Sequence, residues 1–361
     1  MHNPDTIDAS GPLVPNAAPS PPLSPEDPSP FIEGTRIQWA WDSSSLSAMK
    51  RCPREYFYSQ YLGLRRKRRS APATFGGAFA KAMEVFETEA PRLGREPATT
   101  LALEAAAIAA EGMEDHKSRT KEALMRSIAA YINHHATDSL ETMTMTNGEP
   151  AVEMHFQIPL GNLVPAIPGT TIVLCGYMDR VVRFQDSPYV LDNKTTGSSI
   201  STEKGSEAYF KNFTPDNQMT TYTWAAREGF GFPVRGVIVD AMQIAKTKTE
   251  FARSIIHRTP AQIDEWRSGL PYWVRLAAAS SISAMGAKTP TEAAASFPMN
   301  ETSCHKYGGC PYRNICGKDP AVRQAFLDTD FEVREWNPLA KRTKGTIANQ
   351  DATAESEPTD D

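Results

Sequence analysis

The stretch that decides the fold is Gly176-Tyr-Met-Asp179-Arg-Val-Val-Arg-Phe184, which Gln185-Asp186-Ser187-Pro188 joins to Tyr189-Val-Leu-Asp192-Asn-Lys194. Two β-rich runs around a turn-prone stretch predict a β-hairpin. A turn centred between residues 185 and 186 places Asp179 opposite Asp192, with their Cβ atoms ~5 Å apart. Lys194 lies two residues after Asp192, so it points to the same face of its strand. The sequence therefore predicts that two carboxylates and one ammonium group converge.

This charged group suits a divalent cation. Two facing carboxylates repel each other unless a positive charge lies between them. A hard cation such as Mg²⁺ takes oxygen ligands, lowers the pKa of a bound water and stabilises charge on a phosphodiester. Asp179 and Asp192 are therefore candidate metal ligands, with the backbone carbonyl of Asn193 beside them, and Lys194 is a candidate catalytic cation. The alternative is a surface ion pair on an exposed strand.

An Asp-x-Lys spacing is not specific by itself. The same spacing occurs in Asp115-His-Lys117. We expect that copy to lie in a helix, where residues two apart do not share a face. It should therefore be chemically inactive, and the predicted hairpin is what distinguishes the copy at Asp192.

The remaining pattern predicts an α/β fold between two tails. Pro/Ser-rich residues 1–34 and acidic residues 337–361 cannot bury enough apolar surface and are expected to be disordered, which leaves residues 35–336 as the folded part. The expected helices are 46–61, one following Gly76-Gly77, two within 98–140, 207–227 and one from Thr259-Pro260; the expected strands are 152–158, 171–184, 189–194, 234–244 and 250–257.

Several short motifs follow one another in a specific order. They are Ser44–Leu64 with Cys-Pro-Arg-Glu-Tyr-Phe-Tyr, Gly76–Glu84, Gly176-Tyr-Met-Asp179, Asp192-Asn-Lys194-Thr, Gln218-x-x-x-Tyr222 and the last three cysteines. Over residues 43–317 this order resembles the PD-(D/E)xK nucleases, and particularly the RecB-like branch with the iron-sulfur exonucleases of CRISPR and recombination systems. The resemblance implies a restriction-endonuclease-like mixed sheet core flanked by helices, with an N-terminal helical region, a helical insertion at about 98–140 and a C-terminal cysteine cluster.

The resemblance also implies an activity. The implied activity is that of a Mg²⁺- or Mn²⁺-dependent DNA nuclease, and an exonuclease of recombination, repair or end processing is expected. The implied partners are DNA and a recombination or helicase protein. Asp179 and Asp192 would be metal ligands and Lys194 the catalytic lysine. Gln218 and Tyr222, which share a helix face, would contact DNA; the alternative is one packed Tyr beside a satisfied Gln. An RNA-processing nuclease is a rival interpretation.

One departure from the family pattern concerns Ala80. The pattern Phe-Gly-x-x-x-His, with a Glu four residues after the His, matches Phe75, Gly76 and Glu84, but Ala80 occupies the histidine position. Alanine has no donor atom for a metal. The protein uses a reduced metal site, has lost activity and keeps DNA binding, or carries a deliberate inactivating change.

The chain has five cysteines, and a cytosolic location makes disulfides improbable. Cys304, Cys310 and Cys316 lie in a Gly- and Pro-containing loop and supply three thiolates. The resemblance indicates Cys52 as the fourth. Ligand softness fits a [4Fe-4S] cluster and Zn²⁺ equally well, and the resemblance favours [4Fe-4S]. Cys175 is expected to be a buried small hydrophobic residue.

The net charge of -5 is unevenly distributed. The two tails carry -5 and -2, which leaves +2 for residues 35–336. Within this part, Arg65, Arg66, Lys67, Arg68 and Arg69 form a basic run that can neutralise DNA phosphates; a solvated basic turn is the alternative. No apolar run is long enough for a membrane span and no secretory signal is evident, so a cytoplasmic protein is expected.

Overall fold

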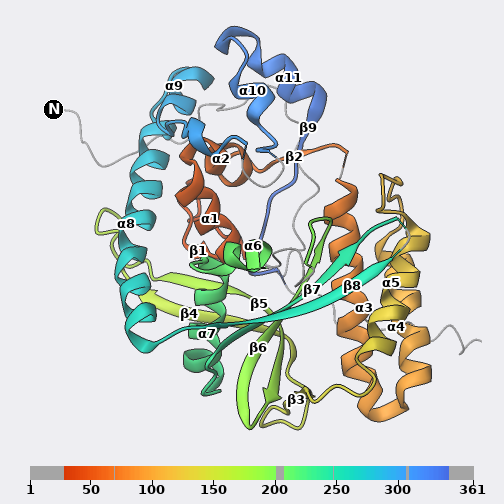
Figure 1. Ribbon diagram of the computed structural model, residues 1–361. Coiled ribbons are helices and arrows are strands. Elements are labelled where there is room, and N and C mark those ends of the chain that lie inside the picture. Colours follow the sequence, from red (N-terminus) through yellow and green to blue (C-terminus); the bar gives the residue numbers. More distant parts are fainter. Residues whose placement is uncertain (1–27, 69, 201–206, 247, 306–308, 341–361) are drawn as a thin grey trace, which may run out of the picture.

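The computed structural model describes residues 28–68, 70–200, 207–246, 248–305 and 309–340 (Figure 1). Most of both predicted tails lies outside these residues. The short pieces of the tails that are described pack on the fold: Phe31 and Leu339 are buried, and Phe31 forms a bridge with Gln38.

A seven-stranded mixed sheet forms the centre of the molecule. Strand β6 pairs in parallel with β7 and β1 in parallel with β5, whereas β3–β5, β4–β5, β5–β6 and β7–β8 are antiparallel. The strands are β1 (Ala40–Trp41), β3 (Glu141–Thr142), β4 (Val152–Gly161), β5 (Ile172–Phe184), β6 (Ser187–Thr196), β7 (Gly236–Ile244) and β8 (Thr249–His257). All five predicted strands are found.

Helices cover both faces of the sheet (Figure 1). On one face lie α3 (Ala71–Leu93), α4 (Arg95–Ala109) and α5 (Lys121–His134), which share a core with Met242 and Ile244 of β7. On the other face lie α1 (Ser43–Arg51), α7 (Asn217–Phe230) and α8 (Pro260–Met285), which pack with β4 and β5. The predicted α/β class, a mixed sheet flanked by helices, is confirmed.

A segment from the first part of the described chain and one from its last part lie together, in the upper part of Figure 1. Strand β2 (Leu64–Arg66) pairs antiparallel with β9 (Phe331–Val333). The short α2 (Pro53–Tyr56) and the π-helix Phe57–Tyr61 precede β2, and α9 (Pro290–Ala295), α10 (Arg313–Cys316) and α11 (Arg323–Asp330) precede β9.

Helix α3 starts earlier than predicted. It begins at Ala71 because Ser70 caps it, accepting a hydrogen bond from the N–H of Ala73, and Pro72 lies in the first turn. The Gly76-Gly77 pair therefore lies inside the helix. At Gly76 the helix approaches β6 so closely that a Cβ atom would lie 3.3 Å from Thr195 Oγ1.

Two other helix predictions were wrong in detail. Asp115 to Lys117 lie in a turn between α4 and α5, where His116 pairs with Arg119 and Lys117 has a φ of +55°. The segment predicted as one helix over 207–227 is broken into α6 (Glu207–Phe210) and α7. Thr214-Pro215 separates them, because proline restricts the residue before it and has no N–H to donate.

No helix within the described residues is long and apolar enough to cross a membrane.

Candidate active site

The predicted hairpin forms with the predicted register. Its strand pairs run from Phe184–Ser187 to Arg180–Leu191, so Asp179 and Asp192 occupy the next opposed positions. Gln185 and Asp186 form the turn with φ values of +46° and +59°. Two consecutive positive values are typical of a type I′ turn, whose twist matches that of the flanking strands. The two-residue turn thus fixes which side chains meet.

Asp179 turns its carboxylate towards the neighbouring strand. The backbone N–H of Asn193 donates to Asp179 Oδ2 over 3.0 Å. This hydrogen bond holds the Asp179 side chain beside Asn193 of β6, the residue that follows Asp192. A role for the Asn193 carbonyl as a metal ligand stays a prediction.

Asp192 and Lys194 form an ion pair in which Asp192 is buried and Lys194 is partly exposed. Lys194 Nζ lies 2.6 Å from Asp192 Oδ2, and the Asp192 side chain is only 2% exposed. Burial raises the pKa of Asp192; Lys194 opposes this shift and the charge of Asp179 adds to it. Burial alone would lower the pKa of Lys194, but Asp192 and Asp179 outweigh it and raise that pKa. Lys194 therefore remains a cation over the whole neutral range.

Helix α7 covers this ion pair with the two predicted polar residues. Lys194 Nζ donates to Gln218 Oε1 over 3.1 Å, and Gln218 Nε2 donates to the Tyr222 hydroxyl over 2.9 Å. Burial, with the charges of Asp192 and Asp179, raises the pKa of Tyr222 well above its usual value. The structure thus joins Asp192, Lys194, Gln218 and Tyr222 in one chain of contacts, while contact of the last two with DNA stays a prediction.

Glu153 is a further acidic residue at this place that the sequence did not reveal. It lies on β4 between the pairs Val152–Arg180 and Met154–Met178, which places it opposite Asp179. Its φ of +46° is unusual for a strand residue. Its charge contributes to the raised pKa of Tyr222. Residues 162–171 connect β4 with β5, and a connection of this length does not fix the register of the two strands. The position of Glu153 opposite Asp179 could therefore not be predicted from the sequence.

The opposite face of β6 carries a second polar group. The Tyr131 hydroxyl of α5 donates to Asp240 Oδ2 over 2.8 Å and to Asn193 Oδ1 over 3.1 Å. Asp240 lies on β7 directly beside Asn193. Arg253 Nε donates to the same Asp240 oxygen over 2.7 Å. Asn193, between Asp192 and Lys194, is therefore held on the opposite face of β6 by α5, a helix of the predicted insertion.

His135 belongs to this second group. His135 Nδ1 lies 3.0 Å from Arg253 Nη2 and 3.1 Å from Asp138 Oδ2. Arg253 Nη1 also pairs with Asp138 Oδ2 over 2.5 Å. Burial lowers the pKa of His135 to about 4, with Asp240 opposing and Arg253 adding to the shift. His135 is therefore neutral at pH 7.

Ala80 lies on α3 one turn after Gly76, the residue that faces Thr195. It is partly exposed, and residues four apart share a helix face. Glu84, one turn further on, forms an ion pair with Lys81 over 2.8 Å. The carboxylate that follows the histidine position in the family pattern thus has a cation of its own helix as partner.

The carboxylates fit Mg²⁺ or Mn²⁺ as a pair. Within the described residues no three His, Cys, Asp or Glu side chains are grouped so that they could hold a metal ion. A site for Mg²⁺ needs only one or two carboxylates when water and substrate phosphates supply the other oxygens. Apart from the ion pair with Lys194, no hydrogen bond of suitable geometry reaches the buried Asp192 Oδ2 from any described residue. That oxygen can therefore serve as a ligand.

Four cysteines lie in the region where the chain ends meet. The N–H of Asn300 donates to Cys52 Sγ over 3.3 Å, and the N–H of Cys310 donates to the carbonyl of Cys304 over 3.0 Å. Burial raises the pKa of Cys310, and the charges of Glu55, Cys52 and Cys304 add to the shift. Burial raises the pKa of Cys316 to about 11, and Cys310 and Cys52 again contribute. The four thiols are therefore close enough to interact, although they do not form a metal site as they stand.

Cys175 lies apart from these four. It is buried, and its Sγ donates to the carbonyl of Trp41 over 3.3 Å. Burial raises its pKa far above the usual value. These contacts agree with the predicted role of a small core residue.

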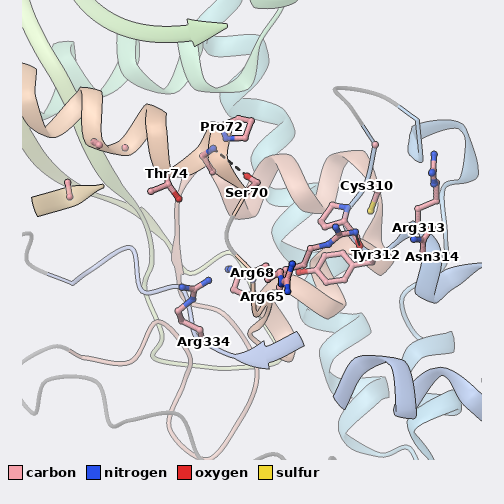
Figure 2. A pocket seen from close by; sticks show the side chains of 17 residues that line it. Arg65, Arg68, Ser70, Pro72, Thr74, Cys310, Tyr312, Arg313, Asn314 and Arg334 are labelled. Carbon is pink, nitrogen blue, oxygen red and sulfur yellow. Dashed lines mark hydrogen bonds between the residues drawn. The ribbon is translucent and has the colours of Figure 1, made fainter. Parts of the chain in front are cut away.

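The basic run follows the π-helix and passes through β2. Arg66 Nη2 donates to the carbonyl of Pro311 over 2.9 Å, and Lys67 Nζ donates to the carbonyl of Asp328 over 2.7 Å. Arg65, Arg66 and Arg68 line a pocket with residues of the cysteine loop (Figure 2). Arg69 lies outside the described residues.

Comparison with known families agrees with this geometry. The model of the PD-(D/E)XK nuclease superfamily matches residues 41–317, and the chain belongs to this superfamily. Its members typically use Mg²⁺ or Mn²⁺. Membership of the RecB-like branch stays a prediction.

Comparisons with individual proteins add little. No curated protein matches the chain. Among solved structures, the crystal structure of SSO0001 is 12% identical over 52% of this chain and 72% of its own, with a TM-score of 0.22. A similarity of this size supports no conclusion about activity.

Proposed function

We propose that this protein is a Mg²⁺- or Mn²⁺-dependent DNA nuclease with its active site at Asp179, Asp192 and Lys194. The observation that carries the proposal is the ion pair of Lys194 with the buried Asp192, beside the carboxylate of Asp179. Such an ion pair on an exposed strand would have little chemical meaning. Here the carboxylate is buried and α7 contacts the lysine, in a member of a nuclease superfamily.

Each of the three side chains has a distinct task in phosphodiester hydrolysis. The Asp179 and Asp192 carboxylates would hold the divalent ion, which lowers the pKa of a bound water and neutralises charge on the phosphate. Asn193 orients Asp179 through its backbone N–H. Lys194, held between Asp192 and Gln218, is a fixed cation that stabilises the additional negative charge of the transition state.

The more specific features of the proposal rest on the motif resemblance. They are an exonuclease activity on DNA in recombination, repair or end processing, contact of Gln218 and Tyr222 with DNA, and a recombination or helicase protein as partner. We also propose that Cys52, Cys304, Cys310 and Cys316 hold a [4Fe-4S] cluster. Zn²⁺ is the alternative occupant of the same thiolates.

The decisive experiment compares wild type with Asp192→Ala on labelled linear DNA, circular DNA and RNA in the presence of Mg²⁺ or Mn²⁺. We expect Asp192→Ala to lower the cleavage rate by at least about 100-fold, because it removes a ligand of the metal ion that neutralises charge in the transition state. Cleavage of linear but not circular DNA indicates an exonuclease, and preference for RNA indicates the rival RNA-processing activity.

Asp115→Ala is the matched control for this experiment. Asp115 has the same spacing to a lysine but lies in a turn outside the sheet, so its loss should leave the rate unchanged. Undiminished cleavage by folded, contaminant-free Asp192→Ala protein would remove the catalytic assignment.

A further inference from the structure

We propose that a pocket between α3 and the cysteine loop binds phosphate groups of the nucleic-acid strand that the active site cleaves; this inference rests on the proposed function. The pocket has a volume of about 820 Å³. Five arginines line it, and no Asp or Glu is among its described lining residues; the arginines are Arg65, Arg66, Arg68, Arg313 and Arg334. In the view of Figure 2, Arg334 and Arg313 lie on opposite sides, with Arg65 and Arg68 between them.

The positive charges of the pocket are only weakly compensated. Arg65 Nη1 donates to the carbonyls of Ser59 and Leu64, and Arg66 Nη2 donates to that of Pro311. These acceptors are neutral, and a guanidinium has five N–H donors, so further donors and the whole charge remain for a ligand. Arg68 is exposed and makes no ion pair or hydrogen bond with any residue that the structure describes. Arg334 has the carboxylate of Glu332 at 3.9 Å, where both side chains are partly exposed.

The other lining residues favour phosphate over bases as the ligand. Tyr312 is the single aromatic residue among the described residues that line the pocket, and it is 2% exposed, with its hydroxyl donating to the carbonyl of Leu64. The described lining residues therefore offer a base no aromatic surface on which to stack. Ser70, Thr74 and Asn314 add small polar groups to the lining. Arginines with small polar neighbours contact the sugar-phosphate backbone without reading sequence.

Helix α3 places the pocket next to the catalytic strand. Thr74 and Gly77 line the pocket, and Gly76 between them approaches Thr195, the residue after Lys194. One helical turn rises only ~5.4 Å. The beginning of α3 therefore links the pocket to the strand that carries Lys194. Because Lys194 and Thr195 point to opposite faces of β6, a nucleic-acid strand that reaches both sites must pass from one face of this strand to the other.

The test measures binding without cleavage. A fluorescein-labelled single-stranded DNA is titrated with the full-length protein in EDTA at several salt concentrations, and the variant is Arg68→Ala with Arg313→Ala. Both side chains are exposed, so the fold should tolerate the change. We expect about 10-fold weaker binding at low salt, and a salt dependence of log Kd that is less steep by roughly 1.4, because each phosphate contact on a single strand contributes ~0.7.

Three controls make the result specific. Arg68→Lys with Arg313→Lys keeps the charge and should retain most of the affinity. Lys121→Ala with Arg126→Ala removes two exposed charges of α5 that are not among the described lining residues of the pocket, and should change little. A strand with neutral methylphosphonate linkages should not distinguish the pocket variant from wild type.

Two phosphate sources are separated by the shape of the DNA. A circular single strand that loses affinity with the pocket variant indicates internal phosphates, whereas loss restricted to 5′-phosphorylated linear strands indicates a terminal phosphate; either result supports the pocket. An unchanged salt dependence, an equal loss with the α5 variant, or no salt-dependent binding by wild type overturns it. The titration in EDTA needs no divalent ion, so it is independent of cleavage. Phosphate binding by a protein that does not cleave nucleic acid would therefore refute the proposed function but leave the pocket assignment intact.

Discussion

At the scale of single residues, pairing of buried charges explains the centre of the molecule. Lys194 pairs with Asp192 on one face of the sheet, and Arg253 pairs with Asp240 on the other. A buried carboxylate without a cation is costly. Lys194 is therefore needed for the charge of Asp192 to be tolerated, and Arg253 for that of Asp240. Lys194 could be predicted, because a spacing of two fixes the face of a strand. Arg253 could not, since its partners Asp138 and Asp240 come from other elements.

Replacing Ala80 by His tests whether the missing donor limits the site. Ala80 follows Gly76 on the face of α3 that approaches Thr195. We expect Ala80→His to increase metal-dependent cleavage about 10-fold by adding a nitrogen ligand. The measurement is the initial rate at several Mn²⁺ concentrations, with Ala80→Leu as a control of size. If the apparent metal affinity and the rate are both unchanged, position 80 is not part of the site.

His135 should make stability depend on pH. Its pKa is about 4 in the native protein and ~6.5 in the unfolded chain, so between these values the unfolded chain binds more protons. Stability therefore falls as the pH drops from 6.5 towards 4. The free energy of unfolding, measured with urea, should decrease between pH 7 and pH 4.5 in both proteins. The decrease should be greater for wild type than for His135→Gln, by at most about 2 kcal/mol. Equal losses in the two proteins would contradict the assignment.

At the scale of elements, predictions succeeded where short-range rules apply. The two-residue turn at Gln185 and Asp186 fixes the hairpin register, and Thr259 with Pro260 marks the start of α8. The break between α6 and α7 was missed, although Pro215 marks it, because the effect of proline on a helix outweighs the apolar periodicity around it. The contact of α5 with β6 had no local signal, because residues 132–192 separate the two partners Tyr131 and Asn193.

Removing the Tyr131 hydroxyl tests whether α5 positions the catalytic strand. Tyr131→Phe keeps the ring contacts with Phe79 and Phe251 but loses the hydrogen bonds to Asn193 and Asp240. We expect a stability loss of about 1–2 kcal/mol and a roughly 5-fold lower kcat with little change in KM. Tyr272→Phe is the control, since this exposed residue is on α8. A kcat equal to that of wild type would limit Tyr131 to a structural role.

At the scale of the whole molecule, contacts between distant segments join the two ends of the domain. Ser303 Oγ donates to the carbonyl of Arg51, Arg54 Nε to that of Phe297, and the Tyr312 hydroxyl to that of Leu64. Strands β2 and β9 add a short antiparallel ladder. The proposed cluster lies in this region and would add covalent links to contacts that already exist. The sequence could predict the cysteines involved, but the hydrogen bonds around them depend on the folded backbone.

The last prediction is that anaerobically purified protein is brown and contains iron and sulfide, and that Cys310→Ala loses both and becomes protease-sensitive. In the metal-free protein, burial raises the pKa values of Cys310 and Cys316, so these thiols are neutral and only a bound metal makes them thiolates. Metal binding then contributes directly to folding, because the unfolded chain has no preformed site.

Its measurements are iron and sulfide content, the visible absorbance spectrum and the rate of limited proteolysis. Cys175→Ala is the matched control, because this buried cysteine lies outside the group and should lose stability without losing iron. Colourless protein with one zinc per chain would refute the iron-sulfur assignment but keep the metal link between the ends. Metal-free protein of full stability would refute both, since the hydrogen bonds between residues 51–64 and 297–312 would then suffice to hold the ends together.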